Sequence, residues 1–285
     1  MPTPRQQLRA LIASGRTTIV PGATDALSAK LIEQHGFEAA YIGSYATAAS
    51  RYGLPDTGLL TLDDLVAQAR TIANVVSIPV IADAEGGFND PANLWRTVQG
   101  FEAAGVAAIH IEDHEGAGKH TSLPQKLRPL EEAAARIRAA VEARQDPDFL
   151  IAARSDALWI GGELGEAARR LKAYADAGAD LVFPTGASPQ QLAEIRRRVD
   201  KPLMIVDLPQ GTVEDEERAG AALVLYYGLS VMVQFDALHT ALETFRRTRD
   251  ANKVAGYRER VQQLEDFIGY REYEERARRL HGPKG

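Results

Sequence analysis

Short apolar segments recur along the chain, and longer segments with helical periodicity separate them. Eight such segments are present, and most have a polar or charged residue at or near the carboxyl end. They span residues 17–23, 38–44, 78–85, 107–113, 149–157, 181–185, 202–207 and 222–228. Buried parallel strands are nearly continuous in apolar residues, and their alternation with helices is typical of parallel α/β proteins. Eight strand–helix units in one chain therefore predict an α/β fold of the (β/α)8 TIM-barrel type.

The segments between the predicted strands carry the start and stop signals of helices. Thr24-Asp25 offers a cap for a helix over residues 26–34, and Gly36 follows its end. Helices are also predicted over residues 6–13, 62–76, 129–143, 163–177, 189–197 and 230–249, with one more beginning at Asp90-Pro91. Residues 45–60 and 114–128 are predicted to be long loops, and such loops inside compact domains are usually functional.

The carboxyl-terminal part of the chain lies beyond what eight units need. We expect residues 1–250 to form the barrel domain and residues 251–285 to form a separate helical segment. This tail is charged, with apolar residues at Val261, Leu264, Phe267 and Ile268. Because an amphipathic helix buries its apolar face against another surface, the tail is predicted to be an oligomerisation segment.

Composition narrows the classes of function. The 285 residues are 45% hydrophobic and 25% charged, which is ordinary for a globular protein. A net charge of −6 argues against nucleic acid as a partner. The absence of cysteine excludes disulfides, thiolate nucleophiles and zinc–thiolate sites. No apolar stretch approaches the ~20 residues that span a bilayer, and no signal peptide precedes the first helix, so we expect a cytoplasmic protein with no membrane contact.

Three acidic residues end two neighbouring predicted strands, where TIM barrels build their active sites. Asp83 and Glu85 are two positions apart, so on a strand their side chains would point the same way, and Glu112 ends the next strand. Carboxylates that converge repel one another unless a cation is present, and oxygen ligands favour Mg²⁺ or Mn²⁺. The alternative is that these acids cap helices or pair with basic side chains.

Basic and small residues near the same edge suggest a site for an anion. Arg154 ends the fifth strand and would bind a substrate carboxylate, or else pair with Asp156 or an acid of the metal site. Lys119 lies in a glycine-bearing loop that could close over a ligand, and the adjacent His120 could exchange a proton near neutral pH. Both could equally be ordinary solvated loop residues. The Gly43-Ser44 turn could hold an anionic oxygen through its N–H groups. His110 lies within a strand and is expected in the core.

Taken in order, these motifs resemble the isocitrate lyase / phosphoenolpyruvate mutase superfamily over most of the chain. The similar stretches are Gly43-Ser44, Gly53-Leu54-Pro55-Asp56, Asp83-Ala84-Glu85-Gly86-Gly87-Phe88, Ile111-Glu112-Asp113 and Ala153-Arg154. The resemblance implies a Mg²⁺-dependent barrel with a gating loop after the fourth strand, and Asp56 in the outer shell of the metal. It also implies a homotetramer in which carboxyl-terminal helices are swapped between neighbours.

Departures from the family pattern bear on the reaction. Isocitrate and methylisocitrate lyases carry a catalytic cysteine in the gating loop, whereas this chain has Lys119-His120-Thr121-Ser122-Leu123, which argues against those two activities. The chain is similar to the cysteine-free oxaloacetate decarboxylase and phosphonopyruvate-type members. Its loop resembles that of phosphoenolpyruvate mutase and phosphonopyruvate hydrolase at Lys119 and Ser122, although Thr121 replaces an asparagine. Glu85 stands where the family usually has aspartate. After the eighth strand, residues 227–230 lack the arginine or histidine of several subfamilies.

The resemblance and the residues together predict a Mg²⁺-dependent carbon–carbon lyase or decarboxylase. Its substrate would be a small anionic 2-oxo or 2-hydroxy dicarboxylate, cleaved through an enolate. The predicted metal residues are Asp83, Glu85, Glu112 and Asp56, the catalytic residues Lys119, His120 and Arg154, and the substrate-binding residues Ser44, Tyr45, Arg154 and Asp207. The proton would come from His120 or from water at the metal. Phosphoenolpyruvate mutase or phosphonopyruvate hydrolase chemistry is the alternative, because Lys119 and Ser122 fit that loop. A third alternative is a barrel that only binds a metabolite.

Overall fold

The computed structural model describes residues 1–116, 121 and 124–282. These residues fall into two compact units, which comprise residues 1–231 and 232–285. The sequence places the boundary near residue 250 instead.

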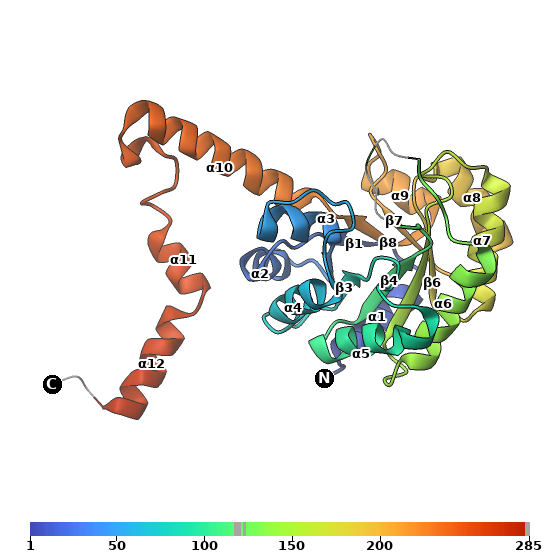
Figure 1. The fold of residues 1–285 in the computed structure, drawn as a ribbon. Helices are drawn as coiled ribbons and strands as arrows, with labels where there is room; N and C mark the ends of the chain where they lie inside the picture. The colour runs from blue at the N-terminus through green and yellow to red at the C-terminus, as the bar shows by residue number, and fades with distance from the viewer. Residues whose placement is uncertain (117–120, 122–123, 283–285) are drawn as a thin grey trace. The chain divides into compact units, whose positions relative to one another are not determined.

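A sheet of eight parallel strands forms the centre of the first unit (Figure 1). The strands are β1 (Thr18–Pro21), β2 (Ala40–Ile42), β3 (Val80–Asp83), β4 (Ala108–Glu112), β5 (Leu150–Ser155), β6 (Leu181–Pro184), β7 (Leu203–Val206) and β8 (Ala221–Tyr226). Each strand from β2 to β8 pairs with the next, and β8 pairs with β1. A single bridge between Gly22 and Tyr41 joins β1 to β2 and closes the ring. The predicted (β/α)8 barrel is therefore confirmed.

Side chains alternate between two cores along the strands, as the twofold period of a strand requires. Leu150 and Ala152 of β5 belong to a cluster inside the barrel, whereas Ile151 and Ala153 pack between the sheet and the helices. Leu8 of the first helix is fully buried in the inner cluster. This alternation decides which strand-end residues face the barrel interior.

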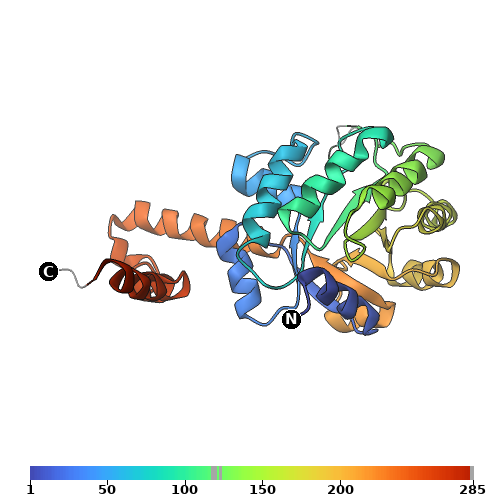
Figure 2. The same ribbon diagram turned by 90° about the horizontal axis from the view of Figure 1, so that it is seen from below.

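Helices surround the sheet, as Figure 2 shows. They are α1 (Pro4–Ala13), α2 (Ala26–Gln34), α4 (Leu62–Ala73), α5 (Leu94–Ala104), α6 (Leu130–Ala143), α7 (Leu164–Asp176), α8 (Pro189–Arg198) and α9 (Val213–Ala219). Thr3, Asp25, Thr61 and Ser188 begin their helices with reciprocal side-chain and backbone hydrogen bonds. A short 3₁₀ turn, η2 (Pro91–Asn93), leads into α5. The capping signals thus mark helix starts correctly.

Two helical segments differ from the sequence prediction. Residues 45–60 were expected to form a loop, but α3 (Ser44–Thr47) and the π-helical turn η1 (Ala48–Tyr52) occupy its first half. Alanine is the strongest helix former, and Gly53 ends the turn in the left-handed conformation with φ of 64°. The other segment is α9, which no periodicity predicts because it is short. It starts at Thr212, whose N–H and hydroxyl both donate to Asp215.

The second unit consists of helices. α10 (Leu229–Thr248) begins in the first unit, and η3 (Ala251–Lys253), α11 (Val261–Phe267) and α12 (Tyr270–His281) follow. The helical nature of the tail is confirmed. None of the described residues in α10, α11 or α12 is buried within the single chain. No described helix is both long and apolar enough to cross a membrane.

Candidate active site

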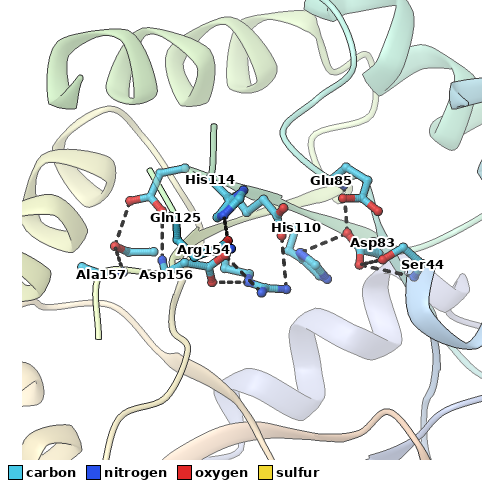
Figure 3. Close-up of polar contacts among 12 residues, drawn as sticks. Ser44, Asp83, Glu85, His110, His114, Gln125, Arg154, Asp156 and Ala157 are labelled. Atoms are coloured by element: carbon cyan, nitrogen blue, oxygen red, sulfur yellow. Dashed lines mark hydrogen bonds and ion pairs between the residues drawn. The ribbon is translucent and has the colours of Figure 1, made fainter. Parts of the chain in front are cut away.

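Strand register brings charged residues together at the carboxyl ends of β3, β4 and β5. Side chains alternate along a strand, so Arg154 lies on the same inward face of β5 as Leu150 and Ala152. Glu112 of β4 pairs with Arg154 in the strand register, and Asp83 of β3 pairs with His110 of β4. Polar groups that the sequence places at the ends of separate strands therefore meet at one mouth of the barrel (Figure 3).

Three carboxylates converge at this mouth. Asp83, Glu85 and Glu112 each offer one oxygen, and these atoms lie within 4.8 Å of one another. Asp83 and Glu112 are buried, whereas Glu85 is half-buried. Carboxylate oxygens at this spacing match the ligand preference of a hard divalent cation, because Mg²⁺ and Mn²⁺ favour oxygen donors. The residues present thus fit the metal that the sequence predicts.

A turn, and not a shared strand face, brings Glu85 to the other acids. Strand β3 ends at Asp83, and Glu85 has a left-handed backbone with φ of 49°. Its N–H donates to Oδ1 of Asp83 at 2.8 Å, and its carbonyl accepts the N–H of Glu112 at 2.9 Å. The expected geometry of two side chains on one strand was therefore wrong, although the proximity holds. Left-handed backbone outside glycine is uncommon and is a form of strain that clusters at functional sites.

Ser44 links Asp83 to Asp56. Its hydroxyl lies 3.0 Å from Oδ2 of Asp83 and 3.3 Å from Oδ2 of Asp56, and its N–H donates to Asp83 at 3.3 Å. Asp56 is 7% exposed. In this structure the turn that was expected to hold a substrate oxygen thus holds a carboxylate of the acid cluster, and Asp56 lies behind it.

Arg154 is buried among acids. It donates to Asp156 through Nε at 2.7 Å and Nη2 at 3.2 Å, and Nη1 lies 3.2 Å from Oε2 of Glu112. Burial opposes its positive charge, but Asp156, Glu112 and Asp83 outweigh that effect and raise the pKa of Arg154 well above its ordinary value. The pairing that the sequence left as an alternative is present, and the guanidinium also lines the cavity at the mouth of the barrel.

Asp156 holds Arg154, which is the pairing that the sequence left open as an alternative. The role of Asp113 was not anticipated. Asp113 accepts hydrogen bonds from the Ser155 hydroxyl at 2.8 Å, the Asp156 N–H at 2.9 Å and the Tyr174 hydroxyl at 2.7 Å. Burial raises the pKa of Asp113. Asp113 is therefore a buried acceptor that fixes the end of β5.

His110 is fully buried, as predicted for a core residue. Its Nε2 is 2.9 Å from the Tyr41 hydroxyl. Its Nδ1 lies 3.7 Å from Oδ1 of Asp83, as the dashed line between the two residues marks (Figure 3). This second contact was not predicted. His110 thus contacts the acid cluster through Asp83.

A cavity of about 850 Å³ opens at the mouth. It is lined by six of the predicted site residues, which are Ser44, Tyr45, Asp56, Asp83, Arg154 and Asp207. The rings of Tyr45 and Tyr227 meet edge to face at 5.8 Å, and burial raises the pKa of Asp207. Glu85 and Glu112 line a smaller cavity of about 260 Å³ together with Arg128 and Arg136. The acid cluster therefore borders both cavities.

The loop after β4 is described at its two ends. The N–H of Glu115 donates to the carbonyl of Lys126, and the N–H of Arg128 donates to the carbonyl of Asp113, each at 2.8 Å. His114 also hydrogen-bonds Gln125. The predicted catalytic residues Lys119 and His120 lie outside the described residues.

Comparison with known proteins places the chain in a family. The family model for phosphoenolpyruvate phosphomutase matches residues 8–246. The 2-methylisocitrate lyase of Salmonella typhimurium is 36% identical over 295 residues, which cover 99% of this chain and 98% of that protein.

Solved structures give the same result. The crystal structure of phosphoenolpyruvate phosphomutase from Streptomyces platensis subsp. rosaceus superposes with a TM-score of 0.91 at 32% identity and covers 97% of this chain and 99% of that one. Phosphonopyruvate hydrolase in complex with oxalate and Mg²⁺ superposes with a TM-score of 0.89 at 30% identity, covering 98% and 99%. As its strand-end motifs predict, the chain belongs to the phosphoenolpyruvate phosphomutase family.

Proposed function

We propose that this protein is a Mg²⁺-dependent carbon–carbon lyase or decarboxylase that cleaves a small 2-oxo or 2-hydroxy dicarboxylate. The observation that carries the proposal is the convergence of Asp83, Glu85 and Glu112 within 4.8 Å beside the buried Arg154. The similarity to a 2-methylisocitrate lyase supports cleavage of a carbon–carbon bond. The complex of phosphonopyruvate hydrolase with oxalate and Mg²⁺ supports both the ion and a small carboxylate ligand.

The acid cluster would hold the ion. Asp83, Glu85 and Glu112 would supply the oxygens. Asp56 would stay in the outer shell, where it is linked to Asp83 through the Ser44 hydroxyl. When bound, Mg²⁺ would supply Lewis-acid polarisation of a substrate oxygen. Ser44 and Asp56 keep the carboxylate of Asp83 in place by hydrogen bonding and by charge, which fixes the direction from which a ligand oxygen approaches.

Arg154 would stabilise the negative charge that develops when the carbon–carbon bond breaks. The electron pair of that bond moves into an enolate, and a fixed guanidinium in a buried site stabilises such an oxyanion without reorganisation. Asp156 holds the guanidinium from one side, so Arg154 keeps its orientation toward the cavity. Ser44, Tyr45 and Asp207 would contact the ends of the substrate. As the sequence predicts, Lys119 would stabilise negative charge and His120 would donate the proton.

The test is proton and phosphorus NMR of the purified protein with Mg²⁺ and a panel of oxaloacetate, alkylmalates, 2-methylisocitrate and phosphonopyruvate. The proposal expects release of pyruvate or another oxo acid from a carbon substrate, and loss of that release on addition of EDTA. Turnover that persists unchanged in EDTA would contradict the role of the metal. Because this chain has no cysteine, 2-methylisocitrate is expected to react poorly.

Cleavage of a carbon–phosphorus bond is the second candidate. The similarity to phosphoenolpyruvate phosphomutase and phosphonopyruvate hydrolase favours it, as do Lys119 and Ser122 in the loop. Turnover of phosphonopyruvate alone, seen as a new phosphorus resonance, would establish this second candidate and exclude the first.

A further inference from the structure

A buried polar network lies between the end of β5 and helix α7. Its centre is Asp113, which follows Glu112 of the acid cluster in the chain and is buried. Asp113 contacts three consecutive residues at the end of β5. Its N–H donates to the carbonyl of Arg154 at 3.2 Å, and its carboxylate accepts the Ser155 hydroxyl at 2.8 Å and the Asp156 N–H at 2.9 Å. Asp113 therefore fixes the backbone from which the Arg154 side chain extends.

Two residues of α7 hold Asp113 from its other side. The Tyr174 hydroxyl donates to Oδ2 of Asp113 at 2.7 Å, and Nη1 of Arg170 lies 3.4 Å from the same oxygen. Arg170 also donates to the Tyr174 hydroxyl at 3.3 Å and to the carbonyl of Arg128 at 3.0 Å. Both side chains are buried. Because they are four positions apart, they lie on the same face of the helix and reach one carboxylate.

The hydrogen bonds continue from Asp113 to the acid cluster. The carboxylate of Asp156 accepts hydrogen bonds from Nε and Nη2 of Arg154 at 2.7 and 3.2 Å. The third nitrogen of the guanidinium lies 3.2 Å from Oε2 of Glu112. A hydroxyl in the outer layer of helices is thus connected to the acid cluster through Asp113, Asp156 and Arg154 in turn.

The surroundings of Tyr174 indicate that its hydroxyl serves geometry more than packing. The inward face of α7 already buries three apolar side chains, Ala167, Ala168 and Leu171. A phenylalanine ring would fill the same space as the ring of Tyr174. Buried charged groups lose their hydration, so such a network adds little net stability over an apolar contact. A functional side chain, however, needs hydrogen bonds behind it that hold it in one orientation.

We propose that Tyr174 and Arg170 are positioning residues, which set the orientation of the Arg154 guanidinium through Asp113. The inference rests on the proposed function for what Arg154 does to the substrate, whereas the positioning itself is a property of the protein without substrate. Neither Tyr174 nor Arg170 lines the two cavities at the mouth of the barrel. An effect of either residue on the site therefore has to pass through other side chains.

The first experiment observes Arg154 directly and without a ligand. In spectra of protein with ¹⁵N-labelled arginine, the Nε–H resonance of Arg154 is the one that the Arg154→Lys protein lacks. This proton should exchange slowly with water, because Nε donates to Asp156 in a buried site. We expect Tyr174→Phe to shift the resonance and to raise its exchange rate about fivefold or more, because the buried bond opens more often.

A matched tyrosine provides the control for this experiment. The Tyr226 hydroxyl also donates to a carboxylate at 2.7 Å, that of Glu216, but it belongs to β8. Tyr226→Phe should therefore leave the Arg154 resonance unchanged. Circular dichroism checks that both variants fold. An unchanged Arg154 resonance in folded Tyr174→Phe would overturn the inference, whatever reaction the protein catalyses.

A second pair of variants tests Arg170. Arg170→Lys keeps the positive charge, but the single nitrogen of lysine cannot reproduce the separate contacts of a guanidinium. Arg169→Lys is the control, because Arg169 is exposed and pairs with Glu166, as Arg170 does. We expect Arg170→Lys to disturb the Arg154 resonance in the same way as Tyr174→Phe, and Arg169→Lys to leave it unchanged. Equal effects of the two lysine variants would contradict a specific role of Arg170.

A double-mutant cycle tests whether Tyr174 acts through Arg154. Calorimetry gives the dissociation constant of oxalate, a planar dianion like an enolate, for the Mg²⁺-loaded wild type, Tyr174→Phe, Arg154→Lys and the double variant. We expect Tyr174→Phe to weaken oxalate binding about fivefold with Arg154 present and less than about twofold with lysine in its place, because coupled residues are not additive. Equal weakening in both backgrounds would overturn the inference. A wild-type protein that does not bind oxalate would count against the proposed function, and the Arg154 resonance would still decide the positioning role.

Discussion

At the scale of single residues, the site balances negative charge with one buried guanidinium. Glu112 has two roles in this balance, since it belongs to the acid cluster and lies 3.2 Å from Arg154. We predict that Glu112→Gln lowers Mg²⁺ affinity at least tenfold and turnover about a hundredfold, because it removes one ligand charge. Calorimetric titration with Mg²⁺ and a turnover assay measure both effects. Glu115→Gln, on an exposed loop residue three positions along, is the matched control. Unchanged Mg²⁺ affinity in Glu112→Gln would remove that residue from the metal site.

Glu85 is a residue where stability and function are expected to conflict. It has a left-handed backbone and stands near two other carboxylates. Glu85→Gly would relieve both the backbone strain and the repulsion, so we predict an increase in the free energy of unfolding of about 1 kcal/mol without metal. The same change should weaken Mg²⁺ binding. Urea denaturation in EDTA and calorimetry give the two quantities. A less stable Glu85→Gly protein would show that the turn is not strained.

These residues also show how far the sequence determines the site. Their types and strand-end positions were sufficient to predict an acid cluster next to Arg154, because strand order in a barrel follows chain order. The turn at Glu85 and the Ser44–Asp83–Asp56 hydrogen bonds were not predicted. Both depend on backbone torsion angles that a single sequence does not display.

At the scale of secondary structure, the eight strands follow from their apolar runs, and capping boxes mark the helix starts. The short helices α3 and α9 were missed for a physical reason. α3 (Ser44–Thr47) and α9 (Val213–Ala219) contain four and seven residues, too few for a hydrophobic period to show. Glycine and proline at positions 53 and 55 also made the first of these segments resemble a loop.

Arg5 ties the amino-terminal helix α1 to the barrel. Arg5 donates to the carboxylate of Asp146 at 2.7 Å, to the carbonyl of Glu102 at 2.7 Å and to that of Val106 at 3.2 Å. These bonds tie α1, and with it the buried Leu8, to the connections that flank β4 and β5. The hydrogen bond from Arg5 lowers the pKa of Asp146.

The Asp146 carboxylate therefore gives a stability that depends on pH. The pKa of Asp146 is lower in the folded protein than its unfolded value of about 3.9. The stabilisation that its carboxylate provides is therefore complete above the unfolded pKa. It is lost as the pH falls through the folded pKa. We predict that Asp146→Asn costs about 0.5 kcal/mol at pH 7, since the pair is partly exposed. The cost should shrink toward zero as the pH falls through the lowered pKa of Asp146 in the folded protein. Urea unfolding at several pH values measures it, with the exposed Asp200→Asn as control. A difference that is constant with pH would refute the ionic origin.

At the scale of the whole molecule, the second unit displays more apolar surface than a single chain would keep in water. Phe235, Leu238, Leu242 and Phe245 of α10 are 73%, 61%, 59% and 49% exposed. Their spacing of three, four and three residues places them along one side of the helix. An exposed apolar stripe of this kind marks an interaction surface. We therefore extend to α10 the prediction of an oligomerisation role that the sequence made for the tail.

We predict that the protein self-associates through this stripe, and that the assembly is a homotetramer. The Phe235→Asp/Leu238→Asp double variant places two charges on the stripe, so it should shift the mass measured by light scattering from four chains toward one or two. Thr240→Asp is the control, because it adds a charge to an exposed polar position of the same helix. The barrel of residues 1–231 has its own buried core, so the double variant should retain its circular dichroism spectrum. A wild-type chain that is monomeric at micromolar concentration would contradict the prediction. A tetramer that the double variant leaves intact would instead place the interface elsewhere on the chain.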